Sequence, residues 1–268
     1  MIEHFPVHEI TLTSDITVRL IDKMGGDHSV VAAAKVSTCG EEALRFAEPD
    51  MAESNAGLIN YLMAQRHGSP FEQSTLQFFV HAPIFVWREW HRHRIGFSYN
   101  EESARYKPLD PVFWVPERGR RMIPIEGWKP GRPKFMTIQF ALDNGYNGWG
   151  GVFGNEIDAD SWYQREIDRD RKSYQVGYDL YRESIDDGFA MEVARCKLPV
   201  AIYSSCWVTC NPRSLMAFAS LRHHDPDAKF VSYPQWEIDQ ACQLAERFLA
   251  EGWPLTYAAF IRNGRVGP

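Results

Sequence analysis

Arginine is concentrated in one short segment, RHRIGFSYNEESARY, which covers residues 92–106. The segment carries Arg92, Arg94 and Arg105 together with one histidine, two glutamates and two serines, and it follows a run that is rich in tryptophan. The arginine guanidinium is flat and permanently charged, so it suits phosphate groups and planar ligands on which it can stack. If RHR is extended, Arg92 and Arg94 point to one side and His93 to the other. The segment predicts a site for a planar, anionic ligand.

Two further arginine loci lie in the C-terminal third of the chain. Residues 211–222, NPRSLMAFASLR, predict a helix with Asn211 as its N-cap and Pro212 at its first position. The N-terminus of such a helix favours an anion. The other locus is Arg195, in EVARCKLP. Three separate loci indicate a ligand, or two ligands, with several phosphates, such as a dinucleotide together with a nucleotide monophosphate.

Arg213 and Arg222 belong to the same predicted helix but not to the same face. They are nine residues apart, which at about 100° and 1.5 Å per residue places them on opposite faces and about 13 Å apart along the axis. We therefore expect that they do not bind one phosphate together. Arg213, in the first turn, has the position that the helix dipole favours for an anion, whereas Arg222, in the last turn, has not. A simpler alternative is that Arg222 only caps the helix C-terminus.

The composition argues against nucleic acid, metal and membrane as partners. The 268 residues carry a formal net charge of −6, with an isoelectric point of about 5.9, so we expect a small anionic ligand and no nucleic acid. The five cysteines are odd in number and form no CxxC pair, which supports neither a disulfide framework nor a zinc site. No signal-peptide pattern and no run near 18 apolar residues is present, so we expect no membrane partner and a cytoplasmic location.

The same residues allow other functions. Single arginines could pair with the 35 acidic residues at the surface, and a non-catalytic nucleotide- or RNA-binding module would use the same cluster. His91, His93 and Glu101 could serve a metal-dependent hydrolase, but a third ligand with suitable spacing is not evident, so we predict no metal. The glycines of residues 148–154, GWGGVFG, are a weak phosphate-loop candidate because no Lys-Ser/Thr follows them.

Apolar periodicity predicts strands and helices in mixed order. The elements expected in the first half are two short strands or a hairpin at 9–22, a helix from an Asp27 cap to Ser37, a helix from an Asp50 cap to Gly68, a strand at 74–82 and a helix opened by Pro83. The RHR segment follows that last helix.

The second half begins with an irregular stretch at 116–154, rich in Gly, Pro and Trp. It is followed by a long helix whose tyrosine stripe is typical of a core face and which ends at Gly188. The elements expected after it are a buried strand at 200–209, the helix at 211–222 and a helix at 234–252. Because strands and helices do not alternate regularly, the pattern favours an α+β fold.

The pattern RHR, eight residues and then Ser103 resembles the signature of the flavin-dependent thymidylate synthases. The segment that leads into it, 69–94, and the blocks MGGDHSVVAAAKVS, EVARCKLP, NPRSLMAFASLR and PQWEID also resemble that family, in the same order. The resemblance implies a single family domain over 1–268, with a mixed or antiparallel sheet and packed helices. It does not cover about 115–161, where we expect an insertion.

The resemblance also implies a reaction, the conversion of dUMP to dTMP. Members of this family take the carbon from methylenetetrahydrofolate, and NADPH reduces a bound FAD that supplies hydride. They are homotetramers with active sites at the subunit interfaces. No cysteine lies in the signature, which agrees with a flavin route that needs no protein nucleophile.

The resemblance assigns site residues by position. The expected FAD contacts are Ser37, Ser69, Arg92, His93, Arg94, Asn100, Glu101, Asn211, Arg213 and Ala217. The expected nucleotide contacts are Glu89, Trp90, His91, Arg92, Glu101, Glu102, Ser103, Ala104, Arg105, Arg195 and Arg222. Arg222 matches the arginine thought to polarise the uracil, since a guanidinium beside the ring stabilises developing negative charge.

Two positions depart from the family pattern. Glu89 stands where some members have Gln, which replaces a hydrogen-bond donor by an acceptor. Ala217 stands where the family often has Asn or His, so only a backbone or packing contact is expected there.

Overall fold

The computed structural model describes residues 8–125, 127, 129, 134–145 and 158–268. Its contacts divide the chain into two compact units, each assembled from separate stretches of sequence. Unit 1 comprises Met1–Asp15, Pro83–Phe85 and Ser103–Ser204, and unit 2 comprises Ile16–Ala82, Val86–Glu102 and Ser205–Pro268. The α+β fold class is confirmed, whereas a single family domain over 1–268 stays a prediction. No helix of the described ranges is long and apolar enough to cross a membrane.

Most of unit 2 is built on a four-stranded sheet of order β2-β3-β8-β4. The strands are β2 (Thr17–Met24), β3 (Thr75–Pro83), β8 (Tyr203–Cys210) and β4 (Phe97–Glu101). The pairs β2–β3 and β4–β8 are antiparallel. Along β3 the side chains alternate between fully buried, at Leu76, Phe78 and Val80, and half-buried, as expected for a strand with one face on the core.

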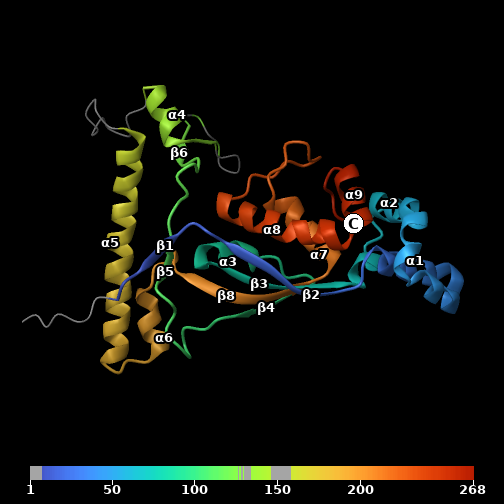
Figure 1. The fold of residues 1–268 in the computed structure, drawn as a ribbon, viewed down its shortest axis with the longest axis horizontal. Helices are drawn as coiled ribbons and strands as arrows, with labels where there is room; N and C mark the ends of the chain where they lie inside the picture. The colour runs from blue at the N-terminus through green and yellow to red at the C-terminus, as the bar shows by residue number, and fades with distance from the viewer. Residues whose placement is uncertain (1–7, 126, 128, 130–133, 146–157) are drawn as a thin grey trace, which may run out of the picture. The chain divides into compact units, whose positions relative to one another are not determined.

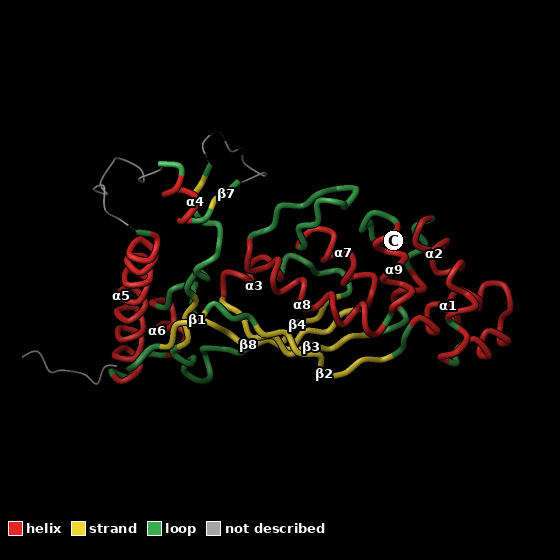
Figure 2. The backbone as a smooth tube through the Cα atoms, turned by 45° about the horizontal axis from the view of Figure 1, so that its top comes forward, coloured by secondary structure: helices red, strands yellow, loops and turns green. Residues whose placement is uncertain are grey.

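Helices cover one face of this sheet. Figures 1 and 2 show α7 (Pro212–Arg222) and α8 (Trp236–Gly252) on the same side of it. The other helices of unit 2 are α1 (Asp27–Cys39), α2 (Ala56–Ala64), α9 (Pro254–Arg262) and most of α3 (Ile84–Trp90). Asp27 joins α1 to α9, because its buried carboxylate accepts hydrogen bonds from the backbone N–H groups of Leu255 and Thr256 at 2.8 and 2.9 Å.

Unit 1 is organised around the long helix α5 (Ala159–Asp186). The predicted stripe is confirmed, since Tyr174, Tyr178 and Tyr181 are buried in one apolar cluster, and Gly188 follows the helix with φ +86°. The remaining elements are the parallel pair β1 (Thr11–Thr13) and β5 (Val112–Trp114), the antiparallel pair β6 (Ile123–Pro124) and β7 (Phe135–Met136), and the helices α4 (Ile138–Asp143) and α6 (Met191–Ala194). The predicted irregular stretch therefore contains short elements, while GWGGVFG lies outside the described residues.

The two strands expected at 9–22 are confirmed, whereas the alternative of a hairpin is wrong. β1 pairs with β5 in unit 1, and β2 pairs with β3 in unit 2. Both strands find their partners far along the chain, and alternation alone does not identify a partner.

The expected helix boundaries in the N-terminal third also need correction. Gly26 is the cap of α1, and Asp27 is its first residue. α2 starts only at Ala56, because 3-10 turns at Pro49–Met51 and Glu53–Asn55 precede it. It is closed by Arg66, with φ +60°, and by the hydrogen bond from His67 N to Leu62 O at 2.9 Å, so neither Asp50 nor Gly68 bounds it.

The C-terminal elements follow the prediction, with one addition. Asn211 caps α7, because its Oδ1 accepts a hydrogen bond from Ser214 N at 2.8 Å, and Pro212 is the first helical residue. The strand β8 and the helix α8 lie where they were expected. Helix α9 was not predicted. It begins at Pro254, directly after α8, and a proline at this place is equally compatible with the end of the preceding helix.

Candidate active site

The RHR segment forms a turn between α3 and β4, so the extended conformation considered above is not adopted. The α3 hydrogen bonds continue past its end, from His91 N to Trp87 O and from His93 N to Trp90 O, both at 2.9 Å. Tyr99 of β4 closes the turn, since its hydroxyl donates to His93 O at 2.6 Å. Burial raises the pKa of Tyr99, which keeps the hydroxyl protonated as a donor. The expected alternation of sides still holds, because Arg92 and Arg94 are exposed and His93 is half-buried.

Arg222, at the end of α7, meets this turn. Its Nε donates to His93 Nε2 at 3.1 Å, and its Nη1 lies 2.8 Å from Glu89 Oε2 of α3. The side chains of Arg222 and Glu89 are only 17% and 29% exposed, so solvent screens the ion pair less than a surface pair. Arg222 is thus held in one orientation by two groups, which is more than a helix C-terminal cap requires.

His93 is held in its neutral form by its surroundings. Burial, the largest cause, and the charges of Arg222 and Arg92 together lower its pKa from 6.5 to about 4. A neutral imidazole has one nitrogen that accepts hydrogen bonds, and the bond from Arg222 assigns this role to Nε2. The charge of Arg222 therefore keeps His93 an acceptor, and His93 in turn orients Arg222.

An aromatic cluster that includes Phe218 of α7 packs against the turn. The ring of Phe218 lies 4.9 Å from the rings of both His93 and Trp90, edge-on to the first and stacked on the second. Phe218 and Trp90 are both fully buried. Because packed rings have few alternative rotamers, they restrict where His93 can lie. The expected nucleotide contact at Trp90 thus involves a residue whose side chain lies in the core.

Gly96 allows the turn to approach the start of α7. Its φ is +69°, and a Cβ at this position would lie 2.1 Å from Ser214 Oγ and 2.9 Å from Asn211 Nδ2. Both the left-handed backbone and the close contact exclude larger residues. The first two arginine loci, RHR and the helix at 211–222, are therefore one cluster within unit 2.

Arg213 lies at the other end of α7, apart from Arg222 as predicted. Its Nη1 is 2.5 Å from Glu72 Oε1, and its Nε donates to the main-chain oxygen of Pro268 at 2.8 Å. Gly68 makes room for the guanidinium, because a Cβ there would lie 2.4 Å from Cζ of Arg213. Glu72 and Pro268 were not predicted as partners; for Glu72, its place in the SPFEQ block was the only available signal.

The other expected ligand contacts in unit 2 lie mainly at its surface. Within the described residues no ion pair or hydrogen bond of the Arg92 or Arg94 side chain is recorded, and both are exposed. Glu102 is half-buried and is bound to β8 through Ser205 N at 3.2 Å. The exposed residues of the expected set are Ser37, Ser69, Asn100, Glu101 and Ala217. A ligand could therefore contact the exposed side chains of this set, and it would displace no recorded partner of Arg92 or Arg94.

The remaining expected nucleotide contacts belong to unit 1. Arg105 Nε donates to Glu192 Oε2 at 3.0 Å, in an exposed ion pair. Ser103 Oγ accepts a hydrogen bond from Arg105 N at 3.3 Å, Ala104 is buried, and Arg195 is exposed in the turn after α6. The Ser103 hydroxyl is thus used locally, with no base recorded beside it in the described part of the chain.

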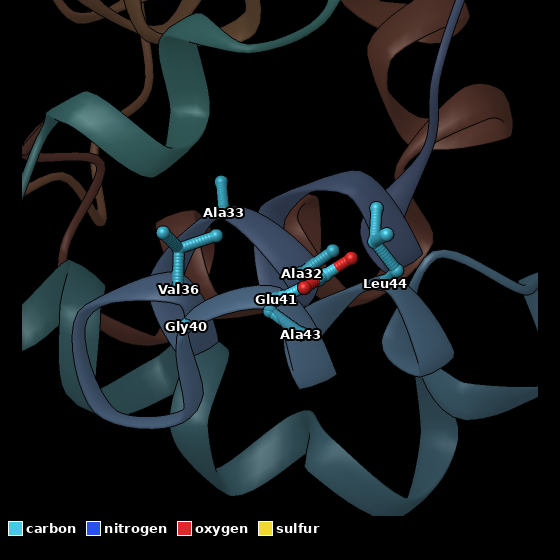
Figure 3. Close-up of a pocket in the computed structure, with 7 residues that line it drawn as sticks. All are labelled: Ala32, Ala33, Val36, Gly40, Glu41, Ala43 and Leu44. Carbon is cyan, nitrogen blue, oxygen red and sulfur yellow. The ribbon is translucent and has the colours of Figure 1, made fainter.

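A shallow apolar hollow lies between α1 and the 3-10 segment Gly40–Phe46, as Figure 3 shows. Its volume is about 370 Å³. The residues that line it are Ala32, Ala33, Val36, Gly40, Glu41, Ala43 and Leu44. It is lined by no arginine, and it is therefore distinct from the charged cluster at RHR.

Across the described ranges, no group of three or more His, Cys, Asp or Glu side chains could hold a metal ion. His91, the first residue of the alternative metal set, packs its ring against Trp87 and Tyr99 at 5.4 and 4.7 Å.

Comparisons with known proteins agree with the resemblance seen in the sequence. Residues 19–255 match the family profile described as Thymidylate synthase complementing protein. The flavin-dependent thymidylate synthase of Streptomyces coelicolor is 44% identical over 261 residues, covering 97% of this chain and 96% of that protein. The enzyme of the same description from Tropheryma whipplei (strain TW08/27) is 40% identical over 264 residues, covering 98% and 100%.

A solved structure shows the same fold at similar identity. It is described as a UMP/dUMP methylase PolB from Streptomyces cacaoi bound with 5-Br dUMP, and it superposes with a TM-score of 0.80 at 40% identity. The match covers 97% of this chain and 100% of that one. By profile, by full-length identity and by fold, the chain belongs to the flavin-dependent thymidylate synthase family.

Proposed function

We propose that this protein catalyses the reductive methylation of dUMP to dTMP. The balanced reaction takes dUMP, methylenetetrahydrofolate, NADPH and a proton, and it yields dTMP, tetrahydrofolate and NADP⁺. The observation that carries the proposal is the orientation of Arg222 by Glu89 and neutral His93, in a chain of this family. An arginine fixed in this way is suited to a defined polar group on a ring.

Arg222 is the catalytic residue of the proposal. Its guanidinium would donate hydrogen bonds to a carbonyl oxygen of the uracil and stabilise negative charge that develops on the ring. Preorganisation matters here, because a donor that is already aimed needs no reorientation during the reaction. Glu89 and His93 supply that preorganisation, since they fix Nη1 and Nε and leave the remaining N–H groups for the substrate.

The cysteines of the sheet are poor candidates for a protein nucleophile. Cys206 and Cys210 of β8 are buried. Burial raises the pKa of the Cys206 thiol to about 12 and raises that of Cys210 as well. Since the thiolate is the nucleophilic form, neither is active near neutral pH, in keeping with a flavin route.

FAD is the proposed cofactor, and the donor set of unit 2 fits it. Exposed Arg92 and Arg94 and the N-terminus of α7, with Arg213 in its first turn, offer positive charge for a diphosphate. When bound and reduced by NADPH, the flavin would supply the hydride. The proposed FAD contacts are Ser37, Ser69, Arg92, His93, Arg94, Asn100, Glu101, Asn211, Arg213 and Ala217. NADPH and methylenetetrahydrofolate are proposed as co-substrates.

The phosphate of dUMP is assigned to residues of unit 1. Ser103, Arg105 and Arg195 match nucleotide contacts of the family, and the exposed pair of Arg105 with Glu192 can exchange the carboxylate for a phosphate at little cost. We further propose a homotetramer in the cytoplasm, with each site built from more than one chain. The spread of the assigned residues from Ser37 to Arg222 supports a shared site.

The test combines a spectrum with a turnover assay. Purified protein, loaded with FAD, should be yellow, should oxidise NADPH in a dUMP-dependent manner and should form dTMP only when methylenetetrahydrofolate is present. A colourless protein that cannot be reconstituted with FAD would favour the non-catalytic nucleotide- or RNA-binding module. Activity that requires a metal and is lost with a chelator would favour the hydrolase instead.

UMP is a second candidate substrate. Two of the solved neighbours are described as a UMP/dUMP methylase PolB from Streptomyces cacaoi, and the second is bound with 5-Br UMP, at a TM-score of 0.77 and 39% identity. Turnover of UMP and dUMP by the same preparation, compared as kcat/KM, separates the two. Preference for UMP would move the assignment from thymidylate formation to methylation of the ribonucleotide.

A further inference from the structure

Arg265 is a buried arginine in an unusual backbone conformation. It is 5% exposed, and its φ is +59°, in the left-handed region that residues other than glycine rarely adopt. Both features cost free energy unless the surroundings compensate them. Arg265 lies beyond the 19–255 span of the family profile, and it is not among the site residues assigned above.

The guanidinium of Arg265 is the centre of a buried charge network. Its Nη2 donates to Glu246 Oε2 at 2.7 Å, its Nη1 lies 3.6 Å from Asp225 Oδ2, and it stacks over the ring of Phe260 at 5.2 Å. His223 Nδ1 lies 2.6 Å from the same Glu246 oxygen. Burial alone would raise the pKa of Glu246, but the hydrogen bonds from His223 and Arg265 outweigh it and hold that pKa below its ordinary value. Glu246 is therefore ionised and ties three segments together.

This network is attached to α7 on both sides of Arg222. His223 is the residue that caps the C-terminus of α7. On the preceding turn, Ser220 Oγ donates to the main-chain oxygen of Arg265 at 2.7 Å. Arg222 thus lies between two residues whose positions depend on Arg265.

The rest of the C-terminal segment, Asn263–Pro268, continues along the same helix. Gly267 packs against the middle of α7, where a Cβ would lie 3.5 Å from Ala217 N. Pro268 accepts the hydrogen bond from Arg213 at the start of the helix. One short segment therefore contacts α7 near its beginning, its middle and its end, which fixes the helix along its length.

We infer that Arg265 is a positioning residue, which holds the end of α7 so that Arg222 reaches Glu89 and His93. The inference rests on the proposed function, because the role of Arg222 is defined there. Arg265 itself does not touch substrate or cofactor in this account. A residue that only stabilises the fold would change how much protein is folded, and not how well the folded protein aligns Arg222.

The decisive variant is Arg265→Lys, with Arg262→Lys as its matched control. Lysine keeps the positive charge beside Glu246 but cannot span Glu246, His223 and Asp225 at once. Arg262 lies three residues earlier, is exposed and has no recorded ion pair among the described residues. We expect dTMP formed per NADPH oxidised to fall about tenfold or more in FAD-loaded Arg265→Lys, since small misplacements of a catalytic group cost this much. Arg262→Lys should stay within about twofold of the parent.

A second readout does not depend on turnover. The charge of Arg222 is one cause of the low pKa of His93, so a displaced Arg222 should let that pKa rise by about half a unit or more. An NMR titration of His93 measures this in parent, Arg265→Lys and Arg262→Lys. Besides Arg222, the described groups that contact His93 include Arg92, the hydroxyl of Tyr99 and the rings of Phe97 and Phe218, none of which is changed.

The outcomes separate the inference from the function on which it rests. An unchanged dTMP-to-NADPH ratio and an unchanged His93 pKa in Arg265→Lys overturn the inference, even if the variant unfolds at a lower temperature. If Arg265→Lys does not fold, Ser220→Ala is the second variant. It removes the hydroxyl that bonds the main-chain oxygens of Arg265 and Met216 at 2.7 and 2.8 Å, and parental values of both quantities overturn the inference in the same way. If the parent forms no dTMP from dUMP, the proposed function fails, and the His93 titration alone decides the positioning role.

Discussion

Arg222 of unit 2 and Arg105 of unit 1 are held in opposite ways. Arg222 is paired with Glu89 while only 17% exposed and is also bonded to a neutral histidine. Arg105 is paired with Glu192, where the two side chains are 51% and 54% exposed. The first pair is preorganised, whereas solvent competes for the second. Under the proposed function, Arg222 therefore acts in one fixed orientation, whereas Arg105 exchanges partners when a ligand arrives.

The largest expected effect follows from changing the preorganised arginine. Arg222→Lys keeps a positive charge but loses the flat fork that contacts Glu89 and His93 together. We expect dTMP formation at saturating dUMP to fall by about 100-fold or more, while the variant folds, retains FAD and oxidises NADPH. Arg247→Lys, at an exposed position on α8, is the control and should match the parent. Parental dTMP formation by Arg222→Lys would make Arg222 structural.

Changing the exposed arginines should affect nucleotide binding instead. Arg105→Ala and Arg195→Ala each remove a charge-assisted contact, so we expect each to weaken dUMP binding by about 1.5–3 kcal/mol. FAD binding should stay at the parental level in both variants. Isothermal titration with each ligand measures the two affinities, and Arg171→Ala, at an exposed position on α5, controls for the loss of an arginine. Equal losses of FAD and dUMP affinity would refute the assignment to the nucleotide.

A pH titration of stability tests the neutral state of His93. Its folded-state pKa of about 4 lies below the ordinary 6.5, so the unfolded chain takes up the proton first as the pH falls. This contribution to the free energy of unfolding is complete above pH 6.5 and is lost as the pH falls toward 4. Between pH 6.5 and 4.5 we expect a loss on the order of 1–2 kcal/mol, discounted because the ring is partly exposed.

His93→Gln is the control for that titration, since it removes the titrating group and leaves the other histidines. Urea unfolding of both proteins at the two pH values gives the difference. The same loss in parent and His93→Gln would show that His93 does not carry the effect.

The smallest effect is expected for the exposed pair itself. A double-mutant cycle with Arg105→Ala and Glu192→Ala should give a coupling free energy of about 0.2–1 kcal/mol, which decreases with added salt. Thermal unfolding of the four proteins at low and high salt measures it. A coupling of about 2 kcal/mol or more, insensitive to salt, would place Arg105 among preorganised groups and remove the contrast with Arg222.

Local signals in the sequence were sufficient for several elements of the fold. At the start of α7, Asn211 accepts a hydrogen bond from the backbone N–H three residues later, so the cap depends only on neighbouring residues. The tyrosine stripe of α5 depends only on helical periodicity. Both were predicted correctly. The opposite faces of Arg213 and Arg222 follow from the same geometry, and the two residues do have separate partners.

Features that depend on distant contacts were not predictable in this way. Gly96 of the RHR turn must fit against Ser214, more than 100 residues along the chain. Phe218 could have been found, because it precedes Arg222 by one helical turn and shares its face. The C-terminal segment around Arg265 carries no motif, and its role depends on contacts with α7 and α8 that only the fold brings together.

Release of tritium from C5 of labelled dUMP tests the central claim most directly, because the methyl group replaces the hydrogen at that carbon. The FAD-loaded parent should release tritium and form dTMP in equal amounts when NADPH and methylenetetrahydrofolate are both present. Omission of either should abolish dTMP, and Arg222→Lys should form little or none. A parent that holds FAD and dUMP but forms no dTMP with all components present would contradict the account.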